Sequence, residues 1–150
     1  MKNLHWISIV LATISFTGLL FAKAARVELS QKCRASDLIA VIEITTTKPG
    51  GASKPYLEVA MAKLVESIKG QVDGTTFLLD YNNGLGCPNV GYAPGDRCLI
   101  FATKLPTGHW ETYNTYFGKF MITNGLVHGF ESETNTSLEA ARKEIRRHLD

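Results

Sequence analysis

The chain contains three cysteines, at positions 33, 87 and 98. Two of them lie in one short stretch, GLGCPNVGYAPGDRCLIF, at residues 84–101. In an oxidising compartment two of the three could form a disulfide, which leaves three possible pairings and one spare thiol. The residues alone leave these pairings open, so the disulfide depends on the compartment and on the fold.

Histidines and acidic residues that could bind a metal or transfer protons are scattered. After the amino-terminal segment, the histidines stand at 109, 128 and 148, with no cysteine or carboxylate at metal-ligand spacing. Asp80 and Asp96 flank the cysteine-containing loop and could form an acid pair, although strand ends and turns commonly carry acids. The H-E-x-x-H, G-x-S-x-G and C-x-x-C motifs and a phosphate-binding glycine loop are absent from the sequence. We therefore expect no enzyme activity, no metal and no cofactor. A hydrolase or metal-dependent enzyme would require His109 and His128 to converge with an acid.

The first 24 residues have the features of a secretory signal peptide. A short basic start, MKNLHW, precedes the uncharged run ISIVLATISFTGLLFA, and AKA then ends at Ala24. The run is short for a bilayer span, which needs about 20 residues. We predict cleavage after Ala24 and an extracytoplasmic product, secreted or periplasmic, without stable membrane insertion. The alternative is an uncleaved amino-terminal anchor.

The charge balance argues against a nucleic-acid partner. Loss of residues 1–24 removes Lys2 and Lys23, so sixteen basic residues become fourteen, against fourteen acidic ones, and the formal net charge falls from +2 to zero. Domains that bind nucleic acid usually carry a basic excess, because neutralising phosphates supplies much of the affinity. We interpret the one basic cluster as the solvated face and last turn of a helix; it consists of Arg142, Lys143, Arg146 and Arg147.

Residues 25–150 have the length of a single domain, and their pattern is mostly β. Stretches rich in Gly and Pro separate short apolar or alternating runs. We predict strands at 37–47, 75–81 and 97–103, and one or two more within 109–122. In the first strand, one face would carry Leu38, Ala40, Ile42 and Ile44.

Two further segments complete the predicted elements. Residues 56–68 fit a strand and a helix; we interpret them as a long strand that ends at Lys69-Gly70, because the flanking strands need a partner. A helix is predicted at about 137–148, where Thr136 and Glu139 have the spacing of a capping box. Its narrow apolar stripe predicts packing on a larger body; the stripe consists of Leu138, Ala141, Ile145 and Leu149.

The order of these segments resembles that of bacterial proteins similar to tissue inhibitors of metalloproteinases, which belong with the netrin-like modules. The matching segments are CRASDLIAVIEI (33–44), a strand ending in ESIKG (66–70), and a cysteine followed by APGDRCLIFA (93–102). Ser36-Asp37 matches the opening of the family's first strand, Lys69-Gly70 matches the close of another, and Gly95 matches a turn before an apolar strand. The resemblance covers about residues 33–127. It implies a mainly β fold, a five-stranded OB-like barrel with the carboxyl-terminal α-helix packed on it.

The resemblance also implies a disulfide, and one departure from the family puts inhibition by zinc chelation in doubt. Cys87 matches a family cysteine and Cys33 opens the first strand, so we predict a Cys33–Cys87 disulfide, with Cys87–Cys98 as the alternative. Cys98 stands where relatives often carry an aromatic residue, so we expect a buried, unpaired thiol. The animal inhibitors begin with a cysteine whose α-amino group chelates the zinc of the target. Here the predicted mature start is Ala25-Arg26-Val27, and an untethered terminus would pay a large ordering entropy on binding, so zinc chelation is in doubt.

We therefore expect a non-catalytic binding module whose partner is an extracytoplasmic protein, with metalloprotease inhibition as one form of that activity. The alternative is a small-ligand or glycan-binding barrel that uses the aromatic strand 109–120. Three aromatics there, Trp110, Tyr116 and Phe120, we interpret as filling the interior and the helix contact. On a regular strand Tyr113 would face the opposite way, which makes it the candidate contact residue.

Overall fold

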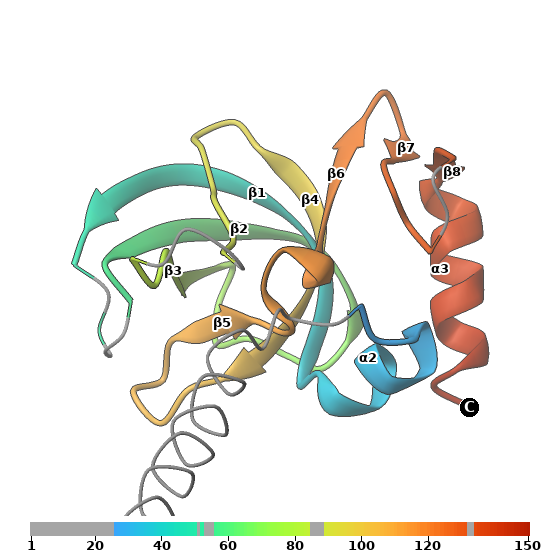
Figure 1. The fold of residues 1–150 in the computed structure, drawn as a ribbon, viewed down its shortest axis with the longest axis horizontal. Helices are drawn as coiled ribbons and strands as arrows, with labels where there is room; N and C mark the ends of the chain where they lie inside the picture. The colour runs from blue at the N-terminus through green and yellow to red at the C-terminus, as the bar shows by residue number, and fades with distance from the viewer. Residues whose placement is uncertain (1–25, 51, 53–55, 85–88, 132–133) are drawn as a thin grey trace, which may run out of the picture.

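The computed structural model describes residues 26–50, 52, 56–84, 89–131 and 134–150. Figure 1 shows a curled sheet with two helices on one side of it. The elements in chain order are helix α2 (Leu29–Ala35), strands β1 (Leu38–Pro49), β2 (Glu58–Lys69), β3 (Thr76–Tyr81), β4 (Arg97–Lys104) and β5 (Trp110–Thr112), the 3-10 helix η1 (Thr115–Gly118), strands β6 (Lys119–Thr123), β7 (Leu126–Val127) and β8 (Thr136–Ser137), and helix α3 (Leu138–Arg147).

The first five strands close into a barrel. Their order is β1-β2-β3-β5-β4, and β4 pairs back with β1. The short β3–β5 pair is parallel, and the other four pairs are antiparallel. This is the mainly β, five-stranded OB-like barrel with a carboxyl-terminal helix that the sequence predicted.

Strand β2 is one long strand, as predicted, although its sequence also fits a helix. Ala60 and Ala62 face the barrel interior, whereas Met61 between them is exposed, which is the alternation of a strand. The β1–β2 register is irregular at Val41/Ile42 and at Ile44/Thr46. Such irregularities bend and twist a strand pair, so they help the long β1–β2 ribbon to curve around the barrel.

The apolar core has two parts, which lie on the two faces of β1 and β4. The predicted shared face of β1 is confirmed, and it is the inner one, because its four residues all lie in the barrel interior: Leu38, Ala40, Ile42 and Ile44. The alternate residues Ile39 and Val41 lie in the second part, with Leu99 and Phe101 of β4. Both faces of these strands are therefore buried, one against the barrel interior and the other against the helices.

Helix α3 covers that second face. Ala141 and Ile145 are fully buried against the barrel, and Leu138 and Leu149 are partly buried beside them, which confirms the predicted apolar stripe. The predicted cap is wrong by one residue. Thr136 is paired in β8, and the Oγ of Ser137 accepts the N–H of Ala140 at 3.1 Å as the N-cap.

Helix α2 was not predicted, and the expectation that Cys33 opens the first strand is wrong. Cys33 lies within α2, which packs beside α3 on the same side of the barrel (Figure 1). Lys69 donates from Nζ to the carbonyl oxygens of Cys33 at 2.7 Å and Ser36 at 2.5 Å. A cation at the carboxyl end of a helix satisfies its free carbonyls, so β2 holds α2 in place.

The aromatic segment is not one regular strand. It forms β5, then η1, then β6. Asn114 and Thr115 both have φ of 55°, in the left-handed region, and a Cβ at Gly118 would lie 2.0 Å from the carbonyl oxygen of Tyr113. The chain therefore makes a tight turn here, which ends the regular alternation on which the predicted faces of Tyr113 and Tyr116 depend.

Candidate binding groove between helix α3 and strand β2

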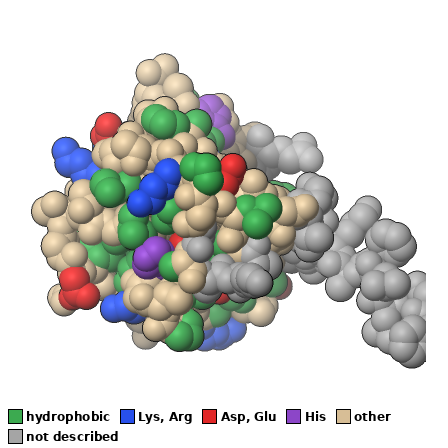
Figure 2. All heavy atoms as spheres, turned by 90° about the vertical axis from the view of Figure 1, so that its left-hand side faces the viewer, with side chains coloured by type: hydrophobic (Ala, Val, Ile, Leu, Met, Phe, Trp, Pro, Cys, Tyr) green, Lys and Arg blue, Asp and Glu red, His purple; other side chains and the backbone are tan. Residues whose placement is uncertain are grey.

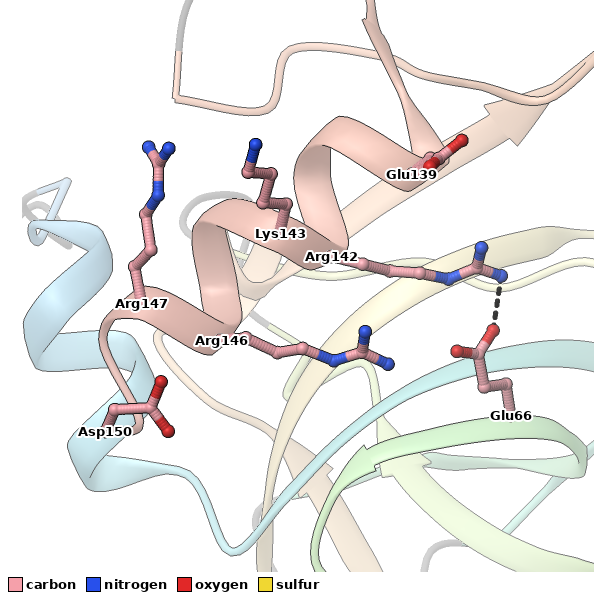
Figure 3. Close-up of a pocket in the computed structure, with 7 residues that line it drawn as sticks. All are labelled: Glu66, Glu139, Arg142, Lys143, Arg146, Arg147 and Asp150. Carbon is pink, nitrogen blue, oxygen red and sulfur yellow. Dashed lines mark hydrogen bonds and ion pairs between the residues drawn. The ribbon is translucent and has the colours of Figure 1, made fainter.

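An open groove of about 590 Å³ lies beside α3. Figure 3 shows that its wall on the barrel side is β2, which contributes Glu66. Its other lining residues come from α3 and the turn after it: Glu139, Arg142, Lys143, Arg146, Arg147 and Asp150. The groove therefore contains all four members of the basic cluster, together with three carboxylates.

The period of α3 determines which arginines point into the groove. Arg142 and Arg146 follow the buried Ala141 and Ile145 by one residue each, so both lie beside the apolar stripe and one turn apart. In Figure 3 both side chains extend in the same direction over the strands, whereas Lys143 and Arg147 point away from them. The two guanidinium groups thus share one side of the groove.

Among the described residues, only one of these two arginines has a carboxylate partner. Arg142 forms an ion pair with Glu66, and their side chains are 30% and 29% exposed. The buried Nε of Arg142 has no hydrogen-bond partner among the described residues. None of the ion pairs between residues that the structure describes involves Arg146 or Lys143.

Two guanidinium groups beside one carboxylate leave an excess of positive charge. Like charges one helical turn apart destabilise a helix by a few tenths of a kcal/mol, so a second anion is favoured there. The planar guanidinium fork binds carboxylate or phosphate oxygens through two parallel hydrogen bonds. From the sequence alone, the basic cluster is interpreted as a solvated helix face. Lys143, Arg146 and Arg147 are exposed, and Arg146 and Arg147 lie in the last turn of α3, in agreement with that interpretation. Arg142 and Arg146 also extend over the barrel (Figure 3).

Sequence reasoning found these arginines but missed Glu66 as their partner. Glu66 and Arg142 are 76 residues apart in the chain, and the strand pattern alone gives no sign of their contact. Strict alternation from the inward-facing Leu64 would place Glu66 on the inner face of β2. The register shift between Val41 and Ile42 changes this, because Glu66 pairs with Val41, whose side chain lies in the second part of the core.

The outer barrel surface also exposes apolar side chains, but they do not dominate it. Met61 and Val65 of β2 are 39% and 43% exposed. On the side of the barrel remote from α3, hydrophobic side chains lie scattered among polar and charged ones (Figure 2). Scattered surface apolar residues are normal, so the charge of the groove is its more specific feature.

The acids and histidines considered for catalysis lie in separate places. Asp80 Oδ1 is 2.7 Å from His109 Nδ1, and its carboxylate is fully buried. Asp96 is bonded instead to Lys119 at 2.7 Å. His128 follows β7, away from the Asp80–His109 pair, and His148 lies 3.6 Å from Glu144 within α3. Among the described residues, no group of three or more His, Cys, Asp or Glu side chains is placed to hold a metal ion.

The Asp80–His109 pair belongs to a polar row across three strands. Glu111 of β5 is paired with Asp80 of β3 and with Thr103 of β4, whose hydroxyl donates to its carboxylate at 3.2 Å. Tyr56 donates to Glu111, and burial together with this hydrogen bond raises the pKa of Tyr56. The N–H of Ala52 donates to Asp80 at 3.2 Å. These two hydrogen bonds therefore attach Ala52 and Tyr56, which lie between β1 and β2, to the barrel wall.

The aromatic side chains differ in part from the prediction. Trp110 and Phe120 are buried in the interior and under the helices, as expected. Tyr116 is 43% exposed and stacks on Phe117 with 4.1 Å between ring centroids, so its predicted burial is wrong. Tyr113 is half-buried against the second part of the core. Its role as a contact residue stays a prediction.

The cysteines occupy two different environments. Cys98 is buried in the barrel interior, as expected, and forms no disulfide with another described cysteine. Cys33 is also fully buried, and its Sγ is 3.9 Å from the carbonyl oxygen of Ile145 in α3. Burial raises the pKa of Cys33 to about 11. Cys87 lies outside the described residues, so both its predicted pairing with Cys33 and the alternative with Cys98 stay predictions.

The predicted signal peptide, residues 1–24, also lies outside the described residues. Within the part of the chain that the structure describes, no helix is long and apolar enough to cross a membrane. No known family model matches the chain, and no curated protein matches it either. Fold and groove define a small OB-like barrel with a charged groove beside its carboxyl-terminal helix. The resemblance to inhibitor-like and netrin-like proteins stays a prediction.

Proposed function

We propose that the mature chain is an extracytoplasmic, non-catalytic module that binds a protein partner through the groove between α3 and β2. Two guanidinium groups face one carboxylate there, and this imbalance is the observation that carries the proposal. Arginine is enriched in protein interfaces because it combines apolar contact with directional hydrogen bonds. The groove would form the charged part of such an interface.

The proposed relationship to inhibitor-like bacterial proteins fits this activity without requiring zinc chelation. The predicted mature terminus has no cysteine, whereas the groove lies on rigid elements, since α3 packs through the fully buried Ala141 and Ile145. A preformed surface loses less conformational entropy on binding than a free terminus does. We therefore assign recognition of the partner to α3 and β2 rather than to the amino terminus.

Co-purification of native partners tests the proposal with charge-reversed variants. The secreted product of the full chain would be captured by an antibody from envelope extract, and its partners quantified by mass spectrometry. Arg146→Glu should reduce recovery of a specific partner at least about tenfold, because it removes a cation and adds repulsion. Arg97→Glu makes the same charge change at an exposed site on β4 and should leave recovery unchanged. Equal recovery by all three proteins would reject the groove as the contact surface.

A second candidate function, binding of a small ligand or glycan, is supported by one observation. Tyr116 is exposed and stacked on Phe117 beside β5, and such ring pairs form stacking platforms for sugars and bases. Binding to an array of oligosaccharides, with Tyr116→Ala compared with Tyr113→Ala, tests this candidate. Loss of a specific signal in Tyr116→Ala would support it, and absence of any bound sugar would reject it.

A further inference from the structure

The charges along the groove follow an ordered pattern. On α3, Glu139 lies at one end of the row, Arg142 and Arg146 lie in the middle, and Asp150 follows the helix at the other end. At 1.5 Å per residue, Glu139 and Arg146 are about 10 Å apart along the helix axis. The row is therefore acidic, basic, basic, acidic over about three turns.

This pattern disfavours a polyanion as the occupant. Glu66, Glu139 and Asp150 would repel a ligand whose charge is negative along its whole length. The predicted mature chain also has no net charge to attract such a ligand, since fourteen basic residues balance fourteen acidic ones. An isolated anionic group between two cationic ones fits the row better.

The two guanidinium groups lie in the middle of the row. The Arg142 guanidinium donates from Nη2 to Glu66, whereas its Nε is buried and out of reach of a bound segment. Arg146 is exposed, and it takes part in none of the ion pairs formed between described residues. Both groups extend over the strands in the same direction (Figure 3).

We infer that the groove binds a partner segment whose carboxylates meet Arg142 and Arg146 and whose flanking basic residues meet Glu139 and Asp150. This inference rests on the proposed function and adds the chemistry of the partner. The carboxylate oxygens accept hydrogen bonds from the two guanidinium groups, and the flanking ammonium groups pair with the acids at the ends of the row. Complementary charge order determines the register of the bound segment.

Two helical peptides of equal composition test the inference. The first carries Lys, Glu, Glu and Lys, in that order, on consecutive turns of one face in a neutral Ala and Gln background. The second carries Glu, Lys, Lys and Glu at the same positions. Each is titrated into the secreted product of the full chain, and binding is followed by the NMR signals of the arginine Nε–Hε groups. Exposed ion pairs contribute about 0.2–1 kcal/mol each, so the first peptide should bind at least about threefold more tightly than the second.

Single variants locate the contact. Arg146→Gln should weaken binding of the first peptide about threefold or more, whereas Arg97→Gln should leave it unchanged. Glu66→Gln releases Arg142 and should tighten binding, whereas Glu43→Gln on β1 should not. Equal binding of the two peptides, or equal weakening by Arg146→Gln and Arg97→Gln, would overturn the inference. The peptide tests could fail in this way while Arg146→Glu still loses a native partner in the co-purification. That combination would reject only the proposed charge order and would leave the proposed function standing.

Discussion

A Cβ atom at Gly70 would lie 2.0 Å from the carbonyl oxygen of Asp37, so the end of β2 and the residue before β1 are in direct backbone contact. Lys69, the residue before Gly70, donates to the carbonyl oxygen of Ser36, the residue before Asp37. Two dipeptides on which the family resemblance depends, Ser36-Asp37 and Lys69-Gly70, thus form one joint. This joint fixes α2 to the barrel.

Substitution of Gly70 tests that joint. Gly70 has φ of +76° and its Cβ would collide with a backbone atom, which cannot move away as a side chain could. We expect Gly70→Ala to lower the free energy of unfolding by about 3 kcal/mol or more. Gly74→Ala is the matched control, since φ is +87° there and nothing lies within 4 Å of the Cβ position. It should cost only about 1 kcal/mol. If urea denaturation showed equal losses of unfolding free energy in Gly70→Ala and Gly74→Ala, the backbone contact between Gly70 and Asp37 would be refuted.

Lys69 should stabilise the structure through its three acceptors. Its ammonium group donates to the carbonyl oxygens of Cys33, Arg34 and Ser36. Lys69→Met keeps the apolar stem and removes these bonds, so we expect a loss of about 1–3 kcal/mol in the free energy of unfolding. Lys63→Met, at an exposed site on the same strand, should change it by less than about 0.5 kcal/mol. A similar loss in both variants would show that Lys69 does not cap α2.

A partly buried ion pair joins α2 to the segment after β7. Lys32 is fully buried, with Nζ 2.8 Å from Glu131 Oε1 and 5.1 Å from the centre of the Phe120 ring. Glu131→Gln leaves a buried ammonium without its counter-charge, so we expect a loss of about 2–4 kcal/mol. The double variant Lys32→Met, Glu131→Gln should lose less than Glu131→Gln alone. The free energies of unfolding of the original protein, the two single variants and the double variant form a double-mutant cycle. Additive losses in this cycle would show that Lys32 and Glu131 do not interact.

Alkaline pH should destabilise the barrel. Burial raises the pKa of the Cys98 thiol from its ordinary 9.0 to about 12, and burial also raises the pKa of Tyr92. The unfolded chain therefore loses these protons at lower pH than the folded chain does. The stabilisation from Cys98 is fully present below pH 9 and is lost as the pH rises to about 12.

The slope of unfolding free energy against pH measures this effect. Each such group contributes up to about 1.4 kcal/mol per pH unit in its window. Cys98→Ala should therefore be less stable at neutral pH but show a shallower decline above pH 9. An identical slope in both proteins would show that the thiol is not shielded from ionisation.

Much of the architecture follows from periodicity, because alternation and the helical stripe each identify a buried face. β1, the long β2 and α3 could be predicted for this reason. α2 could not, since it spans only 7 residues, has no side-chain N-cap, and depends on Lys69 from a distant strand. Such short helices are stabilised by tertiary packing rather than by propensity.

The candidate site could be predicted only where it depends on local spacing. The adjacency of Arg142 and Arg146 is visible in the helical period, but the contact of Arg142 with Glu66 arises from the fold. The faces of Tyr113 and Tyr116 were predicted from a regular strand. The left-handed conformation of Asn114 and Thr115 ends that strand, and neither residue is a glycine that would have marked the turn.

Photo-cross-linking in the cells that express the protein tests the central claim most directly. With p-benzoylphenylalanine in place of Lys143, at the rim of the groove, irradiation should yield a discrete adduct with an extracytoplasmic protein. The same amino acid in place of Asp73, which is fully exposed between β2 and β3, should yield none. Adding Arg146→Glu should abolish the adduct at position 143. An adduct of equal yield at position 73, or one that survives Arg146→Glu, would contradict binding through the groove.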